Sequence, residues 1–132
     1  MKKIYVCSRL RAETKQQYQK HIDEALMFSK FVVRSGFGAP FAPHVYYSLF
    51  LDDTVSADRQ AGMDAGFAYL SVCDGLFAFV NEDEFVSGGM KAEIQYAYDH
   101  NIPVYVFKLE DDVIQPYNSL VDVWSASWLK AL

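Results

Sequence analysis

The sequence contains little of what marks several large classes of protein. Its 132 residues include only two cysteines, Cys7 and Cys73, which lie far apart and each within an apolar stretch. This spacing does not suit a disulfide framework, but it suits free buried thiols in a reducing compartment. No apolar run is long enough to cross a membrane, and the first one ends at Arg9, too early for a secretion signal. We therefore expect a cytoplasmic protein with no membrane partner.

Positive charge is also scarce. Twelve Lys and Arg stand against seventeen Asp and Glu, a formal net charge of −5, and the longest basic clusters are Lys2-Lys3 and Arg9 with Arg11. Proteins that bind the phosphate backbone of DNA or RNA need a concentrated basic surface. Polymeric nucleic acid is therefore not an expected partner.

Signatures of metal sites and of serine hydrolases are missing as well. The three histidines lie far apart, and none has metal-ligand spacing with another histidine or a cysteine: His21, His44 and His100. No G-x-S-x-G elbow, Walker motif or G-x-G-x-x-G fingerprint occurs. We expect no metal and no cofactor. His44, between Pro43 and Val45, is either a structural residue or a functional one.

What the chain does contain suits one folded domain. Hydrophobic residues make up 52% of the sequence, aromatic residues 16% and charged residues 22%, which is a globular composition. The length suits a single domain over residues 1–132. Nine Tyr and ten Phe exceed the needs of a small core. Besides filling the core, such residues line clefts for flat ligands or cover subunit contacts.

Strand-like and helix-like segments alternate along the chain. Apolar, β-rich runs at 3–8, 75–80 and 104–109 predict strands, and helical spacing of apolar residues predicts helices over 12–33, 56–73 and 87–98. The stretch at 38–53 holds two prolines, and we interpret it as a short strand or an extended segment that leads into a loop. The alternation predicts an α/β fold with a doubly wound, Rossmann-like and mostly parallel sheet in one compact domain.

Such a sheet binds its ligand in a crevice at the carboxyl ends of its strands. We therefore expect residues 8–11, the loop at 81–89 and the segment after Leu109 to meet around one crevice. In the helix at 56–73, Gly62 and Gly66 lie four apart and cost helix stability, so we expect a packing or site reason for them.

The helix at 87–98 carries a carboxylate among its apolar residues. Met90, Ile94 and Ala97 form the inward stripe, and Glu93 falls within it. With Ser87 as N-cap, Glu93 lies in the second turn, directed toward the crevice and stabilised as an anion by the positive helix end. A slightly rotated helix would instead leave Glu93 as a solvated edge residue, and the sequence leaves both alternatives open.

The turn before this helix suits an anion. Ser87, Gly88 and Gly89 offer a hydroxyl, a close backbone approach and the positive end of a helix dipole to a phosphate or a sugar. The same residues also serve as a cap and a tight turn, so the motif alone does not establish a ligand site.

Several segments together resemble a known family. The runs "IYVCS", "CDGLFAFV", a variable acidic loop, "SGGMKAEIQYA" and "IPVYVF" are similar to the nucleoside 2-deoxyribosyltransferase-like family, which includes the 2′-deoxynucleoside 5′-phosphate N-hydrolases, over residues 4–109. The elements Ala42-Pro43-His44 and Cys73-Asp74-Gly75 are similar to a poorly characterised phage and bacterial subgroup of that family. The resemblance implies the same Rossmann-like domain.

The resemblance also implies an N-glycosidase or transferase reaction. A glutamate at the position of Glu93 attacks the anomeric carbon of a (deoxy)ribose, releases the base and forms a glycosyl-enzyme ester, which water or a second base resolves. Ser87 stands where the monophosphate hydrolases carry serine and the nucleoside transferases carry aspartate, which favours a small nucleotide as substrate. The other expected ligand contacts are Tyr5, Ser8, Arg9, His44, Tyr46, Gly88, Gly89 and Met90. A surface role for Arg9 is an equal alternative.

One position departs from the family. The family has an aspartate late in the second helix that assists the leaving base or the sugar, and the corresponding residue here is Gly66. Asp64 lies two residues away and points elsewhere on an ideal helix, so the acid is absent, displaced to Asp64 or replaced by a residue such as His44. The alternative function is therefore a non-catalytic protein that binds a nucleotide or an ADP-ribose-like ligand.

The segment Pro116-Tyr117-Asn118 is similar to a Pro-x-Asn segment of the family. In the family, the asparagine of this segment completes the site of a neighbouring subunit. The resemblance therefore implies a homo-oligomer in which Asn118 contributes to a neighbour's site.

Overall fold

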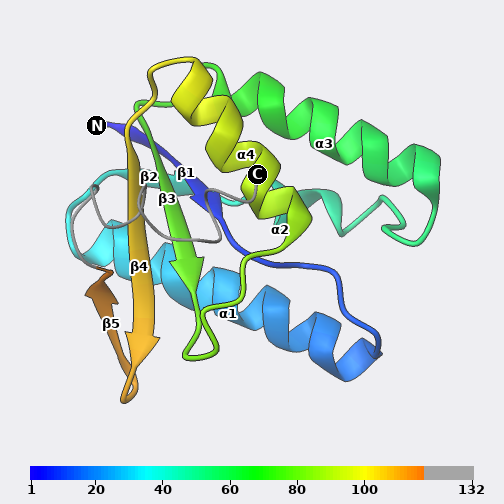
Figure 1. Ribbon diagram of the computed structural model, residues 1–132, viewed down its shortest axis with the longest axis horizontal. Helices are drawn as coiled ribbons and strands as arrows, with labels where there is room; N and C mark the ends of the chain where they lie inside the picture. Colours follow the sequence, from blue (N-terminus) through cyan, green and yellow to red (C-terminus); the bar gives the residue numbers. More distant parts are fainter. Residues whose placement is uncertain (118–132) are drawn as a thin grey trace.

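The computed structural model describes residues 1–117, and its helices and strands alternate as predicted (Figure 1). The strands are β1 (Lys3–Cys7), β2 (Ala39–Phe41), β3 (Gly75–Val80), β4 (Val104–Glu110) and β5 (Val113–Pro116). The helices are α1 (Lys15–Arg34), α2 (Pro43–Tyr47), α3 (Ser56–Leu70) and α4 (Gly88–Asp99).

The strands form one sheet in the order β2-β1-β3-β4-β5. β1 pairs in parallel with β2 and β3, β3 pairs in parallel with β4, and β5 pairs antiparallel with β4. The chain forms β2 on one side of β1 and β3 on the other, so the winding direction changes between β1 and β3. Ligands of doubly wound sheets bind at such a switch point. The predicted α/β, doubly wound and mostly parallel fold is confirmed.

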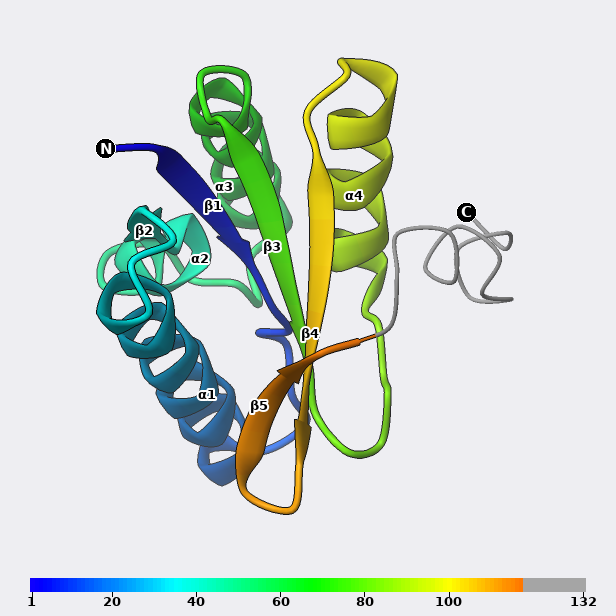
Figure 2. The same cartoon turned by 90° about the vertical axis from the view of Figure 1, so that its left-hand side faces the viewer.

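Helices cover both faces of the sheet. α1 lies against one face, and α3 and α4 lie against the other (Figure 2). Because side chains alternate along a strand, β1 supplies residues to both cores. Ile4 and Val6 join the aromatic cluster under α1, whereas Tyr5 and Cys7 join the cluster under α3 and α4. This alternation turns Tyr5 and Cys7 toward α4.

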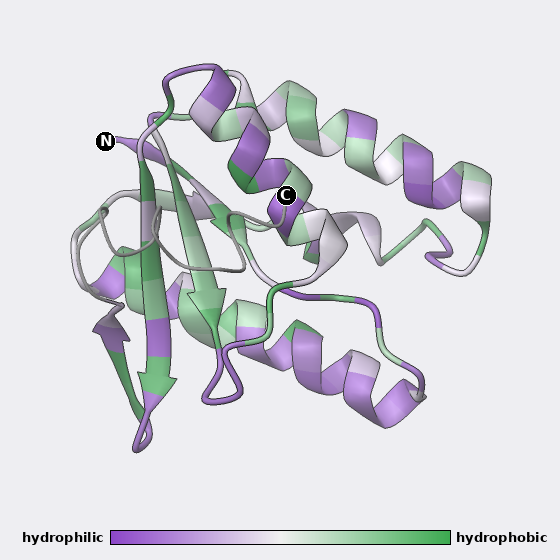
Figure 3. Ribbon diagram, viewed as in Figure 1, coloured by the Kyte–Doolittle hydropathy of each residue, from purple (hydrophilic) through white to green (hydrophobic). Residues whose placement is uncertain are grey.

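Local sequence signals set where two helices begin. Thr14 caps α1 by accepting a hydrogen bond from the Gln17 N–H at 3.1 Å, and Ser87 caps α4 by accepting one from the Met90 N–H at 3.2 Å. The predicted N-cap of α4 is therefore confirmed, and α1 begins later than predicted because its cap is Thr14. Figure 3 shows the hydrophobic sheet strands between helices that carry hydrophilic residues on their outer sides.

Two elements differ from the predictions. The stretch at 38–53 forms β2 and then α2, which begins at Pro43, since proline is favoured at the first position of a helix. After β4, Asp111 and Asp112 adopt positive φ values of 50° and 61° and turn the chain directly into β5. β5 is an edge strand, so the expectation that the segment after Leu109 borders the crevice is not met in its described part.

None of the helices in residues 1–117 is long and apolar enough to span a membrane.

Candidate functional site

A cavity of about 440 Å³ opens beside the carboxyl end of β1. Its walls come from the residues that follow β1, from α2, from the loop before α3 and α3 itself, and from the first turns of α4. Tyr5, Ser8 and Met90 are buried residues of its lining. The cavity therefore brings together most of the residues predicted to contact a ligand: Tyr5, Ser8, His44, Ser87, Gly88, Gly89, Met90 and Glu93.

Glu93 lines this cavity from the second turn of α4 and is not a solvated edge residue. The Tyr5 hydroxyl donates a hydrogen bond to Glu93 Oε2, and the Cys7 thiol lies 3.8 Å from Oε1. Both donors come from the same face of β1. Burial raises the pKa of Glu93 from its ordinary value of 4.5 to about 7, although the hydrogen bonds from Tyr5 and Cys7 oppose this rise. Glu93 is therefore an oriented carboxyl group that titrates near neutral pH.

Tyr5 keeps its proton in this arrangement. The side chain is only 2% exposed, and burial together with the neighbouring Glu93 carboxylate raises the pKa of the Tyr5 phenol above its usual range. A phenol that stays protonated acts as a fixed hydrogen-bond donor. Tyr5 thus holds one carboxylate oxygen of Glu93 and supports its ionised form.

Ser87, Gly88 and Gly89 form the wall of the cavity at the start of α4. The first N–H groups of a helix have no partner within the helix, and they carry the positive end of the helix dipole. The Ser87 oxygen accepts the capping bond from Met90, which leaves the hydroxyl proton free to be donated. A Cβ placed on Gly88 would have no neighbouring atom within 4 Å, so the wall is open at this residue.

A neutral pair lies in the same cavity. Ser8 Oγ and His44 Nε2 are 2.8 Å apart, and both residues line the cavity. Burial lowers the pKa of His44 from 6.5 to about 4, so the imidazole is neutral at pH 7. A neutral imidazole is a poor acid, but it offers hydrogen bonds to a ligand. The short helix α2, which the sequence did not predict, brings His44 to this place.

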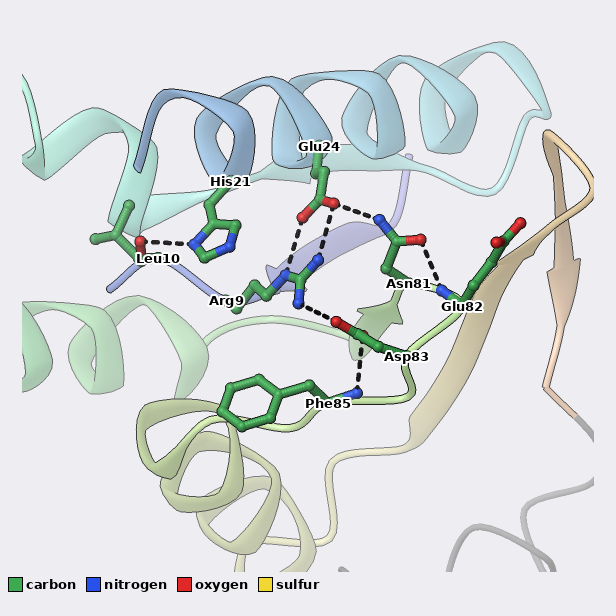
Figure 4. A network of polar contacts seen from close by, with 8 residues as sticks. All are labelled: Arg9, Leu10, His21, Glu24, Asn81, Glu82, Asp83 and Phe85. Atoms are coloured by element: carbon green, nitrogen blue, oxygen red, sulfur yellow. Dashed lines mark hydrogen bonds and ion pairs between the residues drawn. The ribbon is translucent and has the colours of Figure 1, made fainter. Parts of the chain in front are cut away.

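Arg9 does not line the cavity, and its side chain is held in an ion-pair network (Figure 4). Its Nε and Nη2 donate to the two Glu24 oxygens at 3.1 Å each, and its Nη1 donates to Asp83 Oδ2 at 2.7 Å. Asn81 also donates to Glu24. We name this network of Arg9, Glu24, Asn81 and Asp83 the Arg9 clamp. It connects the end of β1, α1 and the loop that leads to Ser87.

Two other predicted residues are not brought to the cavity in the described part of the chain. Tyr46 is half exposed and packs edge-on against Phe50. Asp64 is exposed on α3, where it accepts a hydrogen bond from Gln60 at 2.9 Å. Asn118 lies outside the described residues. Asp64 therefore has no place in the reaction proposed below.

A charged group at the edge of the cavity was not predicted from the sequence. Arg11, Asp53 and Arg59 line it, and we name them the rim cluster. Arg11 Nε lies 3.7 Å from Asp53 Oδ2, and Arg59 Nη1 donates to the Asp53 carbonyl at 3.4 Å. Burial raises the pKa of Asp53 even though both arginines oppose it. The three residues come from separate loops and a helix start, so no local pattern links them.

Within residues 1–117, no group of three or more His, Cys, Asp or Glu side chains is placed to hold a metal ion.

The fold and the cavity define a doubly wound α/β protein with a pocket at its topological switch point. Residues 2–107 match the family DUF7768, which is described as a domain of unknown function, and the chain belongs to this family. Among solved structures, the chain is similar to a 2-deoxyribosyltransferase from the psychrotolerant bacterium Bacillus psychrosaccharolyticus. The TM-score is 0.60 at 18% sequence identity, over 97% of this chain and 94% of that one. At this identity the likeness shows a shared fold. No curated protein matches the sequence.

Proposed function

We propose that the protein is a glycosyl-transfer enzyme that cleaves the N-glycosidic bond of a nucleoside or small nucleotide, with Glu93 as nucleophile. The observation that carries the proposal is the Glu93 carboxyl group, which faces the cavity and accepts a hydrogen bond from the buried Tyr5 hydroxyl. A nucleophilic carboxylate has to be fixed before the substrate arrives, and a hydrogen bond from a rigid strand supplies that orientation. The fold shared with a 2-deoxyribosyltransferase supports the same class of reaction.

The proposed reaction has two steps. A Glu93 oxygen forms a bond to C1′ of the sugar while the bond from C1′ to the base nitrogen breaks, and the electron pair of that bond leaves with the base, which takes up a proton from solvent. Water in a hydrolase, or a second base in a transferase, then forms a bond to C1′ as the ester bond to Glu93 breaks, gives up a proton to solvent, and leaves Glu93 as a carboxylate. The first step needs ionised Glu93, and a pKa of about 7 leaves a large ionised fraction at neutral pH.

The cavity suggests how a substrate lies. The sugar sits at Glu93, and its 5′ group points to Ser87, Gly88 and Gly89, where a phosphate meets helix N–H groups. The base then extends toward Tyr18, Tyr47 and the rim cluster. Aromatic walls suit a flat base, and Asp53 beside two arginines offers both acceptors and donors to its edge.

The direct test is base release from a panel of nucleosides and their 5′-monophosphates, in ribose and deoxyribose forms, followed by chromatography. The wild-type protein is expected to release a free base from at least one member, and Glu93→Gln is expected to abolish that release. A transferase would in addition form a new nucleoside when a second free base is supplied. Base release that persists in Glu93→Gln would exclude Glu93 as the nucleophile.

A second function is favoured by one observation. The position of the family's helix aspartate is Gly66, and Asp64 is exposed and accepts a hydrogen bond from Gln60, so neither of these two positions of α3 supplies an acid to the cavity. A pocket without an effective acid would bind a nucleotide or an ADP-ribose-like ligand and not turn it over. Thermal stabilisation by a member of the same panel, without release of base, would support this binder and overturn the enzyme.

A further inference from the structure

Gly66 lies directly against the Tyr5 hydroxyl. It is a buried residue of α3, and a Cβ placed on it would meet Tyr5 Oη at 2.9 Å. A carbon and an oxygen atom that are not bonded do not approach each other this closely, so an added Cβ would clash with the hydroxyl. The Tyr5 hydroxyl therefore meets two elements, the bare backbone of α3 at Gly66 and the Glu93 carboxylate of α4.

The backbone conformation of Gly66 does not require a glycine. Gly66 lies within α3 and is not among the glycines at positive φ, so an alanine there would adopt the same conformation and favour the helix. Gly62, one turn earlier in the same helix, provides the comparison. A Cβ on Gly62 would contact only Leu51 Cδ1 at 3.6 Å, an ordinary van der Waals distance. The feature particular to Gly66 is the space that it leaves for Tyr5.

We propose that Gly66 is a positioning residue, which makes room for the Tyr5 hydroxyl to bind and orient Glu93. The proposal rests on the proposed function for its effect on catalysis, but the contact itself does not. A side chain at this position would displace the hydroxyl from the place where it binds Glu93 Oε2. The site of this chain therefore leaves room for Tyr5 at the position where the family resemblance implies an acid.

The test compares Gly66→Ala with Gly62→Ala as the matched control. Each variant adds one methyl group to α3, and each favours the helix equally. Gly66→Ala is expected to lower the rate of base release by about tenfold or more and to move the acid limb of its pH profile to higher pH, because Glu93 loses a donor that lowers its pKa. Gly62→Ala adds its methyl group at the wall of the cavity, so the comparison rests on the pH profile, which is expected to stay unmoved because Tyr5 is not displaced. Equal behaviour of the two variants would overturn the proposal.

A double-variant cycle separates the contact from general damage. In the Tyr5→Phe background the hydroxyl is gone, so Gly66→Ala has nothing to displace and is expected to cause no further loss of rate. If Gly66→Ala alone fails to fold, the Tyr5→Phe/Gly66→Ala protein is expected to fold, since the clash is removed. A double variant that is as impaired as the sum of both single changes, or that also fails to fold, would overturn the proposal.

A measurement that does not depend on catalysis is the pKa of the Glu93 carboxyl group, which ¹³C NMR determines as a function of pH. Gly66→Ala is expected to raise the pKa of Glu93, and Gly62→Ala is expected to leave it in place. This measurement distinguishes the two proposals. If no substrate is turned over by wild type, the proposed function fails, while a pKa that rises in Gly66→Ala alone still supports the positioning role, and an unmoved pKa overturns it.

Discussion

Tyr5 and Glu93 are 88 positions apart in the sequence, and the hydroxyl of one donates a hydrogen bond to the carboxylate of the other. The bond joins the first strand of the sheet to α4 across the buried side of the cavity. Because burial raises the pKa of both groups, the phenol keeps its proton while Glu93 titrates near neutrality. Stability and chemistry at this site are therefore both expected to depend on pH near 7.

Replacing Glu93 with glutamine is expected to stabilise the protein more at high pH than at low pH. The folded protein holds the Glu93 proton up to about pH 7, whereas the unfolded chain releases it near 4.5. The free energy of unfolding of wild type therefore falls as the pH rises through this window, by about 1.4 kcal/mol for each unit that the pKa is raised. Thermal unfolding of both proteins at about pH 5 and about pH 8 measures the effect. A Tm difference that is the same at both pH values would contradict the raised pKa.

In the Tyr5→Phe variant the rate of base release is expected to fall by roughly ten- to hundredfold. This loss corresponds to a hydrogen bond to a charged group, which is worth about 1.5–3 kcal/mol. Its loss is expected to be greatest below pH 7, because Glu93 without this donor has a higher pKa and is less ionised there. The measurement is kcat against pH. Tyr105→Phe, on an exposed side chain of β4, serves as control. A Tyr5→Phe profile that coincides with the control would show that the hydroxyl does not act on Glu93.

Arg9→Ala is expected to destabilise the protein by about 3–5 kcal/mol, because it leaves the Glu24 carboxylate buried without its cation. Arg11→Ala removes an arginine whose side chain is 69% exposed and whose ion pair spans 3.7 Å, and it is expected to cost less than about 1 kcal/mol. Denaturant unfolding of the two variants compares them directly. Similar midpoints for both would mean that the Arg9 clamp contributes no more than a surface ion pair.

His44→Gln is expected to reduce the loss of stability in acid. Burial lowers the pKa of His44 from 6.5 to about 4, so the unfolded chain takes up this proton first as the pH falls. Wild type therefore loses stability from His44 between about pH 6.5 and about pH 4, and glutamine, which does not titrate, removes that part of the loss. The Tm difference between the two proteins at about pH 7 and about pH 4.5 is the measurement. If it does not change with pH, His44 has an ordinary pKa.

The sequence predicted the elements whose signals are local. The apolar run of β3 predicted a strand buried on both faces, and Ser87 before the glycines predicted the start of α4. α2 was not predicted because a five-residue helix has little period of its own, and its Pro43 reads equally as a break. β5 was not predicted because its turn depends on two consecutive aspartates at positive φ, a conformation that asparagine and glycine favour more strongly.

Periodicity within one element predicted only part of the candidate site. Glu93 and the Ser87 turn share a helix, and its period indicated a Glu93 that faces the crevice, with a solvated Glu93 as the open alternative. Tyr5, Gly66 and the rim cluster come from other elements, and their approach depends on the packing of α3 and α4 on the sheet. The ion pairs of Arg9 were not predictable either. In the sequence Arg9 is a cation after β1 without an evident partner, and only the fold brings Glu24 and Asp83 to it.

The Arg9 clamp gives the two sides of the pocket different mechanical properties. On one side, the loop before Ser87 cannot swing outward unless the Arg9–Asp83 ion pair breaks, so that wall is braced. On the other side, the Asp53 carboxylate makes only a long 3.7 Å pair with Arg11, although the neighbouring Asp52 binds Thr54 and Asp58. A bulky ligand that needs more room is therefore expected to shift the Arg11 and Asp53 side chains before the wall formed by Ser87, Gly88 and Gly89 moves.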